Sequence, residues 1–167
     1  YPVVYFHDGQ NVLYSKESYS GHSWKIIPTI KRNPDISRMI VVAIDNDGFQ
    51  RMNEYSAWKF QESNIPGQQF GGNGVEYAEF VMEVVKPFID ETYRTKPDRQ
   101  HTAMVGSSLG GNITQFMGLE YQDQIGCLGV FSSANWLHQD AFDRYIKQKE
   151  LMVDQRVFIY VGTEEAD

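Results

Sequence analysis

The chain has 167 residues, of which 41% are hydrophobic and 22% charged, and its formal net charge is −7 at pH 7. That is enough chain for one well-packed domain, whereas two would be crowded. Charges of both signs are mixed along the sequence, which excludes a continuous basic face for nucleic acid or anionic lipid. No apolar run reaches the roughly 20 residues of a membrane span. We therefore expect a soluble, cytoplasmic protein with a small-molecule partner, and its oligomeric state stays open.

The sequence contains one cysteine, Cys127. An internal disulfide and a cysteine-rich metal site are therefore excluded. Because Cys127 lies in the apolar run from Ile125 to Phe131, we expect a buried structural thiol.

Short apolar runs rich in β-branched residues alternate along the chain with longer helical patterns. This alternation is typical of a parallel sheet with helices on both faces, so we predict a three-layer α/β fold. Five runs are expected to be strands: Pro2 to Phe6, Met39 to Ile44, His101 to Gly106, Ile125 to Phe131 and Arg156 to Val161.

Apolar residues recur at helical spacing in four segments between these runs. We expect helices from Ser23 to Lys31, from Gly74 to about Tyr93 with a bend at Pro87, directly after Ser108, and from about Asp140 to Leu151. The segment from Asp45 to Gly74 has no such period and is rich in glycine and aromatic residues. Long loops after strands often shape ligand sites, so we expect this one to form a pocket wall.

Ser108 is the candidate nucleophile. It lies in Gly106-Ser107-Ser108-Leu109-Gly110, between a predicted strand and a predicted helix. In a Gly-x-Ser-x-Gly elbow the strained turn raises the serine hydroxyl, and the flanking glycines avoid collisions with the neighbouring strand and helix. Ser107 occupies the variable position and is expected to point into the fold.

The turn His7-Asp8-Gly9-Gln10-Asn11 follows the first predicted strand. Oxyanion holes in such folds combine the N–H of the residue after the nucleophile, here Leu109, with one from a loop of this kind. Gln10 is our choice for that second donor. The alternative is a turn held by hydrogen bonds of the Asp8 and Asn11 side chains, and both interpretations can hold together.

The triad acid is expected after a strand that follows the nucleophile. The segment Gly162-Thr163-Glu164-Glu165-Ala166-Asp167 follows the last predicted strand. Glu165 is our first choice, with Glu164 and Asp167 as alternatives. A solvated acidic loop is the other interpretation.

Taken together, these motifs resemble the putative-esterase family of α/β-hydrolases, in particular its esterase-D and enterochelin-esterase-like branch. The resemblance rests on His7 to Asn11, Asp45-Asn46 with Arg51, Glu54-Tyr55-Ser56 and Trp58, Gly106 to Gly111, and Val161 to Glu165. It implies a Ser, acid and His triad with Ser108 and Glu165, and the oxyanion donors Gln10 and Leu109.

The histidine of the triad has no counterpart here, because members of the family take it from a loop downstream of the acid. His138 is the one histidine after Ser108, and we expect it at the surface or at a helix start. His101 is expected to be structural, and His7 and His22 have no assigned catalytic role. We therefore expect residues 1–167 to be one α/β-hydrolase domain that lacks its first strands and its C-terminal strand, histidine loop and helix, and to be inactive or feeble alone.

The resulting functional hypothesis is a serine esterase that works through an acyl-enzyme and needs neither metal nor organic cofactor. Its substrate could be a siderophore, an acylated carbohydrate or a small acyl ester. An acyltransferase or a noncatalytic binding domain on a degenerate hydrolase fold are the alternatives. Tyr55 and Trp58 are candidate substrate contacts, although they could simply pack the loop. Arg51 and Glu54 could pair with each other or contact substrate.

Overall fold

The computed structural model describes residues 1–61, 65–152 and 154–164. Five strands form a parallel sheet in the order β2-β1-β5-β6-β7. Their bounds are β1 (Val3–Phe6), β2 (Ile40–Ala43), β5 (Thr102–Ser107), β6 (Cys127–Phe131) and β7 (Arg156–Tyr160). All five strand predictions are confirmed, each within two residues at either end, and so is the α/β class.

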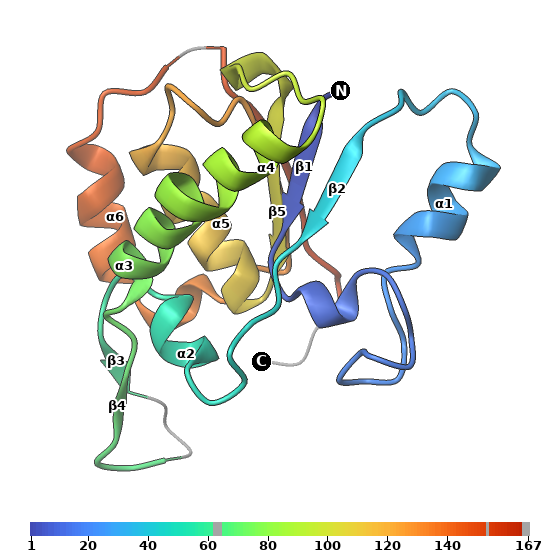
Figure 1. Ribbon diagram of the computed structural model, residues 1–167. Helices are drawn as coiled ribbons and strands as arrows, with labels where there is room; N and C mark the ends of the chain where they lie inside the picture. Colours follow the sequence, from blue (N-terminus) through green and yellow to red (C-terminus); the bar gives the residue numbers. More distant parts are fainter. Residues whose placement is uncertain (62–64, 153, 165–167) are drawn as a thin grey trace.

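The predicted helices are also present. They are α1 (Ile26–Arg32), α3 (Gly74–Glu79) with α4 (Lys86–Thr92), α5 (Leu109–Glu120) and α6 (Gln139–Lys147). Figure 1 shows α3, α4, α5 and α6 gathered on one side of the sheet, with α1 on the other. Between α3 and α4 the chain forms the π-helical segment η2 (Phe80–Val85). The departure from α-helical geometry thus lies before Pro87, where we expected a bend, and the three segments follow one another without a break.

The segment from Asp45 to Gly74 is more structured than we expected. It contains the one-turn helix α2 (Arg51–Glu54) and a small antiparallel ladder of β3 (Phe60–Gln61) with β4 (Gln69–Phe70). Both elements are too short to produce a readable period in the sequence, which is why the pattern predicted a loop.

The core lies between the sheet and α5. Residues alternate between buried and half-buried along β5, while Ile113 and Met117 of α5 have no exposed surface. A Cβ on Gly118 would lie 2.3 Å from a methyl carbon of Leu128 on β6, so the helix packs closely against the strand at this glycine. This packing fixes the start of α5, and with it Ser108, against the sheet.

The edge of the sheet formed by β7 is exposed to solvent. All five residues of β7 are exposed, and Cys127 on the neighbouring strand is half-buried, not buried as we expected. Within the described residues, no helix is long and apolar enough to cross a membrane. The cytoplasmic location stays a prediction.

Candidate active site

Ser108 lies in the turn between β5 and α5 with φ 56° and ψ −124°. A non-glycine residue with positive φ is strained and persists only where its surroundings hold it. The Ser108 N–H donates to the Phe131 carbonyl at 3.0 Å, and its carbonyl accepts from the N–H groups of Gly111 and Ala134 at 3.0 and 3.3 Å. Ser108 is exposed, whereas Leu109 directly after it is buried. The turn therefore presents this serine at the surface, at the carboxyl edge of the sheet.

The glycines on both sides of Ser108 are closely packed. A Cβ on Gly106 would lie 2.2 Å from the Gly110 carbonyl oxygen, which no real contact allows. A Cβ on Gly110 would lie 3.1 Å from Oδ2 of Asp8. The Gly-x-Ser-x-Gly spacing thus has a steric cause in this chain. The second contact also brings the turn after β1 against the start of α5.

The predicted oxyanion donors lie on adjacent turns. Within the described residues, the backbone N–H groups of Leu109 and Gln10 have no hydrogen-bond acceptor. Leu109 opens α5, where N–H groups are unpaired and the helix dipole is positive. Gln10 lies in the 3₁₀ turn η1 (Gly9–Asn11), directly after β1. Because β1 and β5 are paired neighbours, both turns leave the sheet at the same edge. Their role in binding an oxyanion stays a prediction.

The Gln10 turn is hydrogen-bonded to the end of β2 and to the residues that follow it. The Gln10 side-chain amide donates to the Asn46 carbonyl at 3.0 Å and accepts from the Asn46 N–H at 3.2 Å. The Gly9 N–H donates to the Ile44 carbonyl at 2.7 Å, and a Cβ on Gly9 would lie 2.6 Å from the backbone of Ala43. These contacts leave the turn little freedom, so its N–H groups have a fixed direction.

The Asp8 carboxylate is the centre of a second set of contacts. Arg51 donates to it twice, from Nε to Oδ1 at 2.7 Å and from Nη2 to Oδ2 at 2.9 Å, and Asn46 Nδ2 donates to Oδ1 at 2.6 Å. Burial would lower the pKa of Arg51, but the Asp8 carboxylate raises it above its ordinary value, so the guanidinium stays charged. Arg51 therefore pairs with Asp8. The alternative of an ion pair between Arg51 and Glu54 is wrong.

Asn11 supports the turn from its other end. Its Oδ1 accepts from the Ser18 hydroxyl at 3.1 Å and from the Tyr19 N–H at 3.0 Å. The alternative of a turn held by the Asp8 and Asn11 side chains is thus confirmed. It is compatible with a donor role for Gln10.

Tyr55 is completely buried, with 0% of its surface exposed. Its hydroxyl accepts from the Asp8 N–H at 3.0 Å, and its ring packs against the rings of His7 and Tyr77 at centroid distances of 5.4 and 5.1 Å. A ring in this position has no free face for a substrate. The structure therefore corrects the expectation of substrate contact by Tyr55 and favours the packing alternative.

His7 lies within the same buried cluster. Its Nδ1 shares a hydrogen bond of 2.8 Å with the Tyr77 hydroxyl, and its Nε2 is buried without a partner among the described residues. Burial lowers the pKa of His7 to about 4. The imidazole is therefore neutral near pH 7 and supports the turn from inside the fold.

Trp58 is half-buried in an aromatic cluster with Phe116, Phe142, Tyr145 and the His138 ring. Part of its surface lines an open pocket of about 280 Å³. Trp58 therefore packs within the fold, which is one of the two roles that we expected from the sequence. Substrate contact by Trp58 stays a prediction.

The predicted acid follows β7. Ser132 after β6 donates its N–H to the Tyr160 carbonyl at 2.7 Å, so β7 ends at the same sheet edge as the Ser108 turn. Glu164 is exposed in the segment that follows. Glu165, our first choice, and Asp167 lie outside the described residues.

None of the histidines within the described residues hydrogen-bonds to the Ser108 hydroxyl. His138 precedes α6, as expected for a helix start, but it is buried, with Nδ1 3.4 Å from the Ser56 hydroxyl. His101 pairs with Asp98 at the amino edge of the sheet, and His22 is exposed in the loop after Asn11. The general base is therefore not identified among these four side chains.

An open pocket of about 610 Å³ adjoins the Gln10 turn. It is lined by Gln10, Asn11, Glu17, Tyr19, Asn46, Gly48 and Arg51. Sequence reasoning missed both this pocket and the pairing of Asp8 with Arg51. An aspartate in the turn after the first strand and an isolated arginine in a polar segment were the signals available.

Solved structures of similar fold include an enterobactin esterase and a siderophore hydrolase. The enterobactin esterase FES from Shigella flexneri superposes with a TM-score of 0.71 at 15% identity, over 98% of this chain and 40% of its own. Siderophore hydrolase EstA from Aspergillus nidulans superposes with a TM-score of 0.71 at 18% identity, over 98% of this chain and 58% of its own. At such identities the likeness shows the fold alone, and it confirms the predicted α/β-hydrolase fold.

Among curated sequences, the uncharacterized protein YbbA of Bacillus subtilis (strain 168) is 25% identical over 165 residues. The alignment includes 99% of this chain, which spans 62% of the length of that relative. The sequence profile of the family described as "Putative esterase" matches residues 1–167, the whole chain. The resemblance inferred from the motifs is thereby confirmed, and the chain belongs to the putative esterase family.

Proposed function

We propose that the protein is a serine hydrolase of carboxylic esters that works through an acyl-enzyme. The observation that carries this proposal is the exposed Ser108 at positive φ, between a buried strand and the start of a buried helix. A noncatalytic binding module gains nothing from a strained backbone under a solvent-facing hydroxyl.

The proposed reaction has two steps. A histidine takes the proton of the Ser108 hydroxyl while Oγ attacks the ester carbonyl, and the N–H groups of Leu109 and Gln10 bind the oxyanion. The carbon–oxygen bond to the alcohol then breaks, and the histidine returns its proton to the leaving alcohol. Water attacks the acyl-enzyme by the same route and releases the acid. Glu165 orients this histidine, which is not identified among the four histidines of the sequence.

The preorganised turn after β1 supports this assignment of donors. Backbone dipoles stabilise a developing oxyanion only if they need not reorient during the reaction. Gln10 is fixed through Asn46, and Asp8 beside it is fixed through Arg51. The turn is thus rigid before any substrate arrives.

For the substrate we propose an ester of a siderophore, an acylated carbohydrate or a small acyl group. The siderophore class is favoured by the fold neighbours, since EstA is named a siderophore hydrolase and FES an enterobactin esterase. The open pocket beside Gln10, of about 610 Å³, has Arg51 at its wall.

Hydrolysis of p-nitrophenyl acetate by the complete protein tests the proposal. Ser108→Ala is expected to lower kcat/KM by at least about 10³-fold, because it removes the attacking atom. Ser107→Ala is the matched control, since it deletes the neighbouring hydroxyl, and it should keep most of the activity. Equal activity of wild type and Ser108→Ala would refute the proposal.

A further inference from the structure

Another open pocket lies far from Ser108, at the amino-terminal edge of the sheet. It has a volume of about 950 Å³ and is lined by the amino-terminal ends of β1, β5, β6 and β7, at Val3, Thr102, Cys127 and Arg156. Ser108 follows the opposite end of β5. At about 3.3 Å per residue, the six residues of β5 separate the two places by roughly 20 Å. The pocket therefore cannot hold the acyl group that reacts at Ser108.

Basic side chains outnumber acidic ones in the lining of this pocket. Lys96, Arg99 and Arg156 contribute to it, and Asp154 is its one acidic lining residue. The Asp154 carboxylate is already paired with Arg99, whose Nη1 lies 2.7 Å from Oδ2. This is a local excess of positive charge in a chain whose formal net charge is −7, so overall composition does not explain it.

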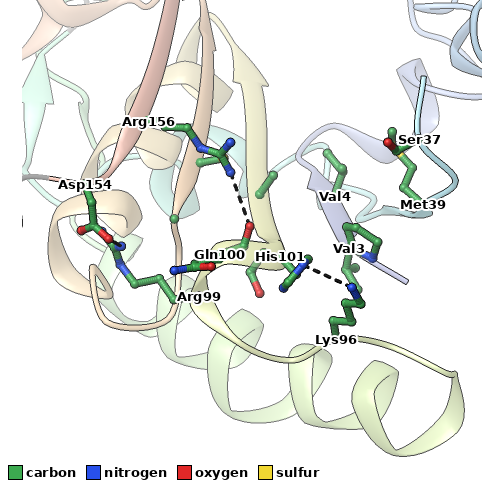
Figure 2. A pocket seen from close by; sticks show the side chains of 15 residues that line it. Val3, Val4, Ser37, Met39, Lys96, Arg99, Gln100, His101, Asp154 and Arg156 are labelled. Atoms are coloured by element: carbon green, nitrogen blue, oxygen red, sulfur yellow. Dashed lines mark hydrogen bonds and ion pairs between the residues drawn. The ribbon is translucent and has the colours of Figure 1, made fainter. Parts of the chain in front are cut away.

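Two of the cations lack a carboxylate partner within the described residues. The Arg156 guanidinium donates to the Gln100 carbonyl at 3.4 Å, which is a long hydrogen bond. The Lys96 ammonium lies 3.5 Å from His101 Nε2, and Figure 2 shows both contacts across the pocket. His101 Nδ1 is bound to Asp98 at 2.8 Å. In the tautomer that donates from Nδ1, Nε2 accepts from Lys96, which leaves further ammonium protons free.

A third unsatisfied donor belongs to Arg99. Its Nε donates to the Gln122 carbonyl and its Nη1 to Asp154, but its Nη2 is buried without a hydrogen-bond partner. A buried guanidinium nitrogen without an acceptor is costly, so the hydrogen-bonding capacity of Arg99 is only partly satisfied.

We propose that this pocket binds a small polyanion, a molecule with two or more phosphate or carboxylate groups. Guanidinium groups bind such oxyanions with paired hydrogen bonds, and an ammonium adds a point charge. One anionic group would meet Lys96 and another Arg156, which face the pocket from different elements. The site would be independent of ester hydrolysis, since it lies at the other edge of the sheet.

Calorimetric titration of the complete protein at low salt tests this inference, with pyrophosphate and citrate as probes. Binding of pyrophosphate alone would assign phosphate ligands, and binding of citrate alone would assign polycarboxylates. Lys96→Gln and Arg156→Gln should each raise Kd by about tenfold or more, as expected for a charged hydrogen bond. The matched controls Lys147→Gln and Arg144→Gln, both exposed on α6 outside the pocket, should leave Kd unchanged.

The polyanion site would be refuted if neither probe binds the wild type, or if the α6 controls weaken binding as much as the pocket variants do. Ser108→Ala should bind the probes like wild type. Failure of the esterase assignment therefore leaves this result unaffected. Thermal unfolding of each variant verifies that the substitution has not unfolded the protein.

Discussion

Asp8 and Arg51 form a two-point ion pair, with Nε to Oδ1 at 2.7 Å and Nη2 to Oδ2 at 2.9 Å. The pair joins the turn after β1 to helix α2, which are 43 residues apart in the sequence. Asp8 itself is buried and has φ 55°. The Arg51 side chain, which is distant in the sequence, therefore stabilises the turn that contains Gln10.

Removal of the Arg51 side chain should weaken the fold and the reaction together. Arg51→Met leaves the buried Asp8 carboxylate with Asn46 alone, and we expect a loss of about 3 kcal/mol in the free energy of unfolding. We also expect a lower kcat, because the Gln10 turn is released. Urea unfolding and ester hydrolysis measure the two effects. Arg38→Met is the control at an exposed position, and a loss of similar size there would contradict the special role of Arg51.

Gly106 should tolerate no side chain. Gly106→Ala places a Cβ 2.2 Å from the Gly110 carbonyl oxygen, so strand or helix must shift. We expect a loss of about 3 kcal/mol in the free energy of unfolding, together with loss of activity. Gly48→Ala provides the comparison, since a Cβ there meets nothing within 4 Å. Equal midpoints of thermal unfolding for the two variants would show that the predicted clash does not exist.

Two substitutions of Gln10 separate the contribution of its backbone from that of its side chain. Gln10→Ala keeps the N–H but breaks the two bonds to Asn46, and we expect a fall in kcat of about tenfold. Gln10→Pro also removes the N–H itself, and a further fall of about 10²-fold is expected, as for loss of one oxyanion donor. The kinetics should be compared after thermal unfolding shows that both variants are folded. If the alanine and proline variants are equally active, the Gln10 N–H is not a donor.

His7 should make the protein less stable in mild acid. Burial lowers its pKa to about 4 in the folded state, against about 6.5 when unfolded. Between these values the unfolded chain binds the additional proton, so stability rises with pH from about 4 to 6.5 and is lost as pH falls. The full difference corresponds to about 3 kcal/mol. His7→Gln should flatten this dependence, which urea unfolding at a series of pH values can measure.

The exposed His22 provides the control for that series. His22→Gln should leave the pH dependence of unfolding as it is in wild type. An unchanged slope in His7→Gln would mean that His7 is not the group that titrates.

Much of the fold was predictable from the sequence because each strand is a short apolar run and each long helix has a clear period. The Gly-x-Ser-x-Gly turn was readable because its steric requirements are local. The ion-pair partner of Arg51 could not be predicted from the sequence, because the nearby Glu54 is as plausible a partner there as the distant Asp8. Burial of Tyr55 was missed for a similar reason. It depends on His7 and Tyr77, which only the folded chain brings together.

The partial exposure of Cys127 is another property that the sequence pattern could not predict. An apolar run predicts a buried strand, but the burial of each residue depends on what covers the strand in space. Next to Cys127, the residues of β7 are exposed along the whole strand. No local pattern carries that information.

Covalent labelling tests the central role of Ser108 most directly. The complete protein would be treated with a fluorophosphonate, digested and mapped by mass spectrometry, with Ser107→Ala and Ser108→Ala treated in parallel. We predict stoichiometric phosphonylation of Ser108 in wild type and in Ser107→Ala, and none in Ser108→Ala. A label on another residue, or an unmodified Ser108 in an active preparation, would contradict the assignment of Ser108 as the nucleophile.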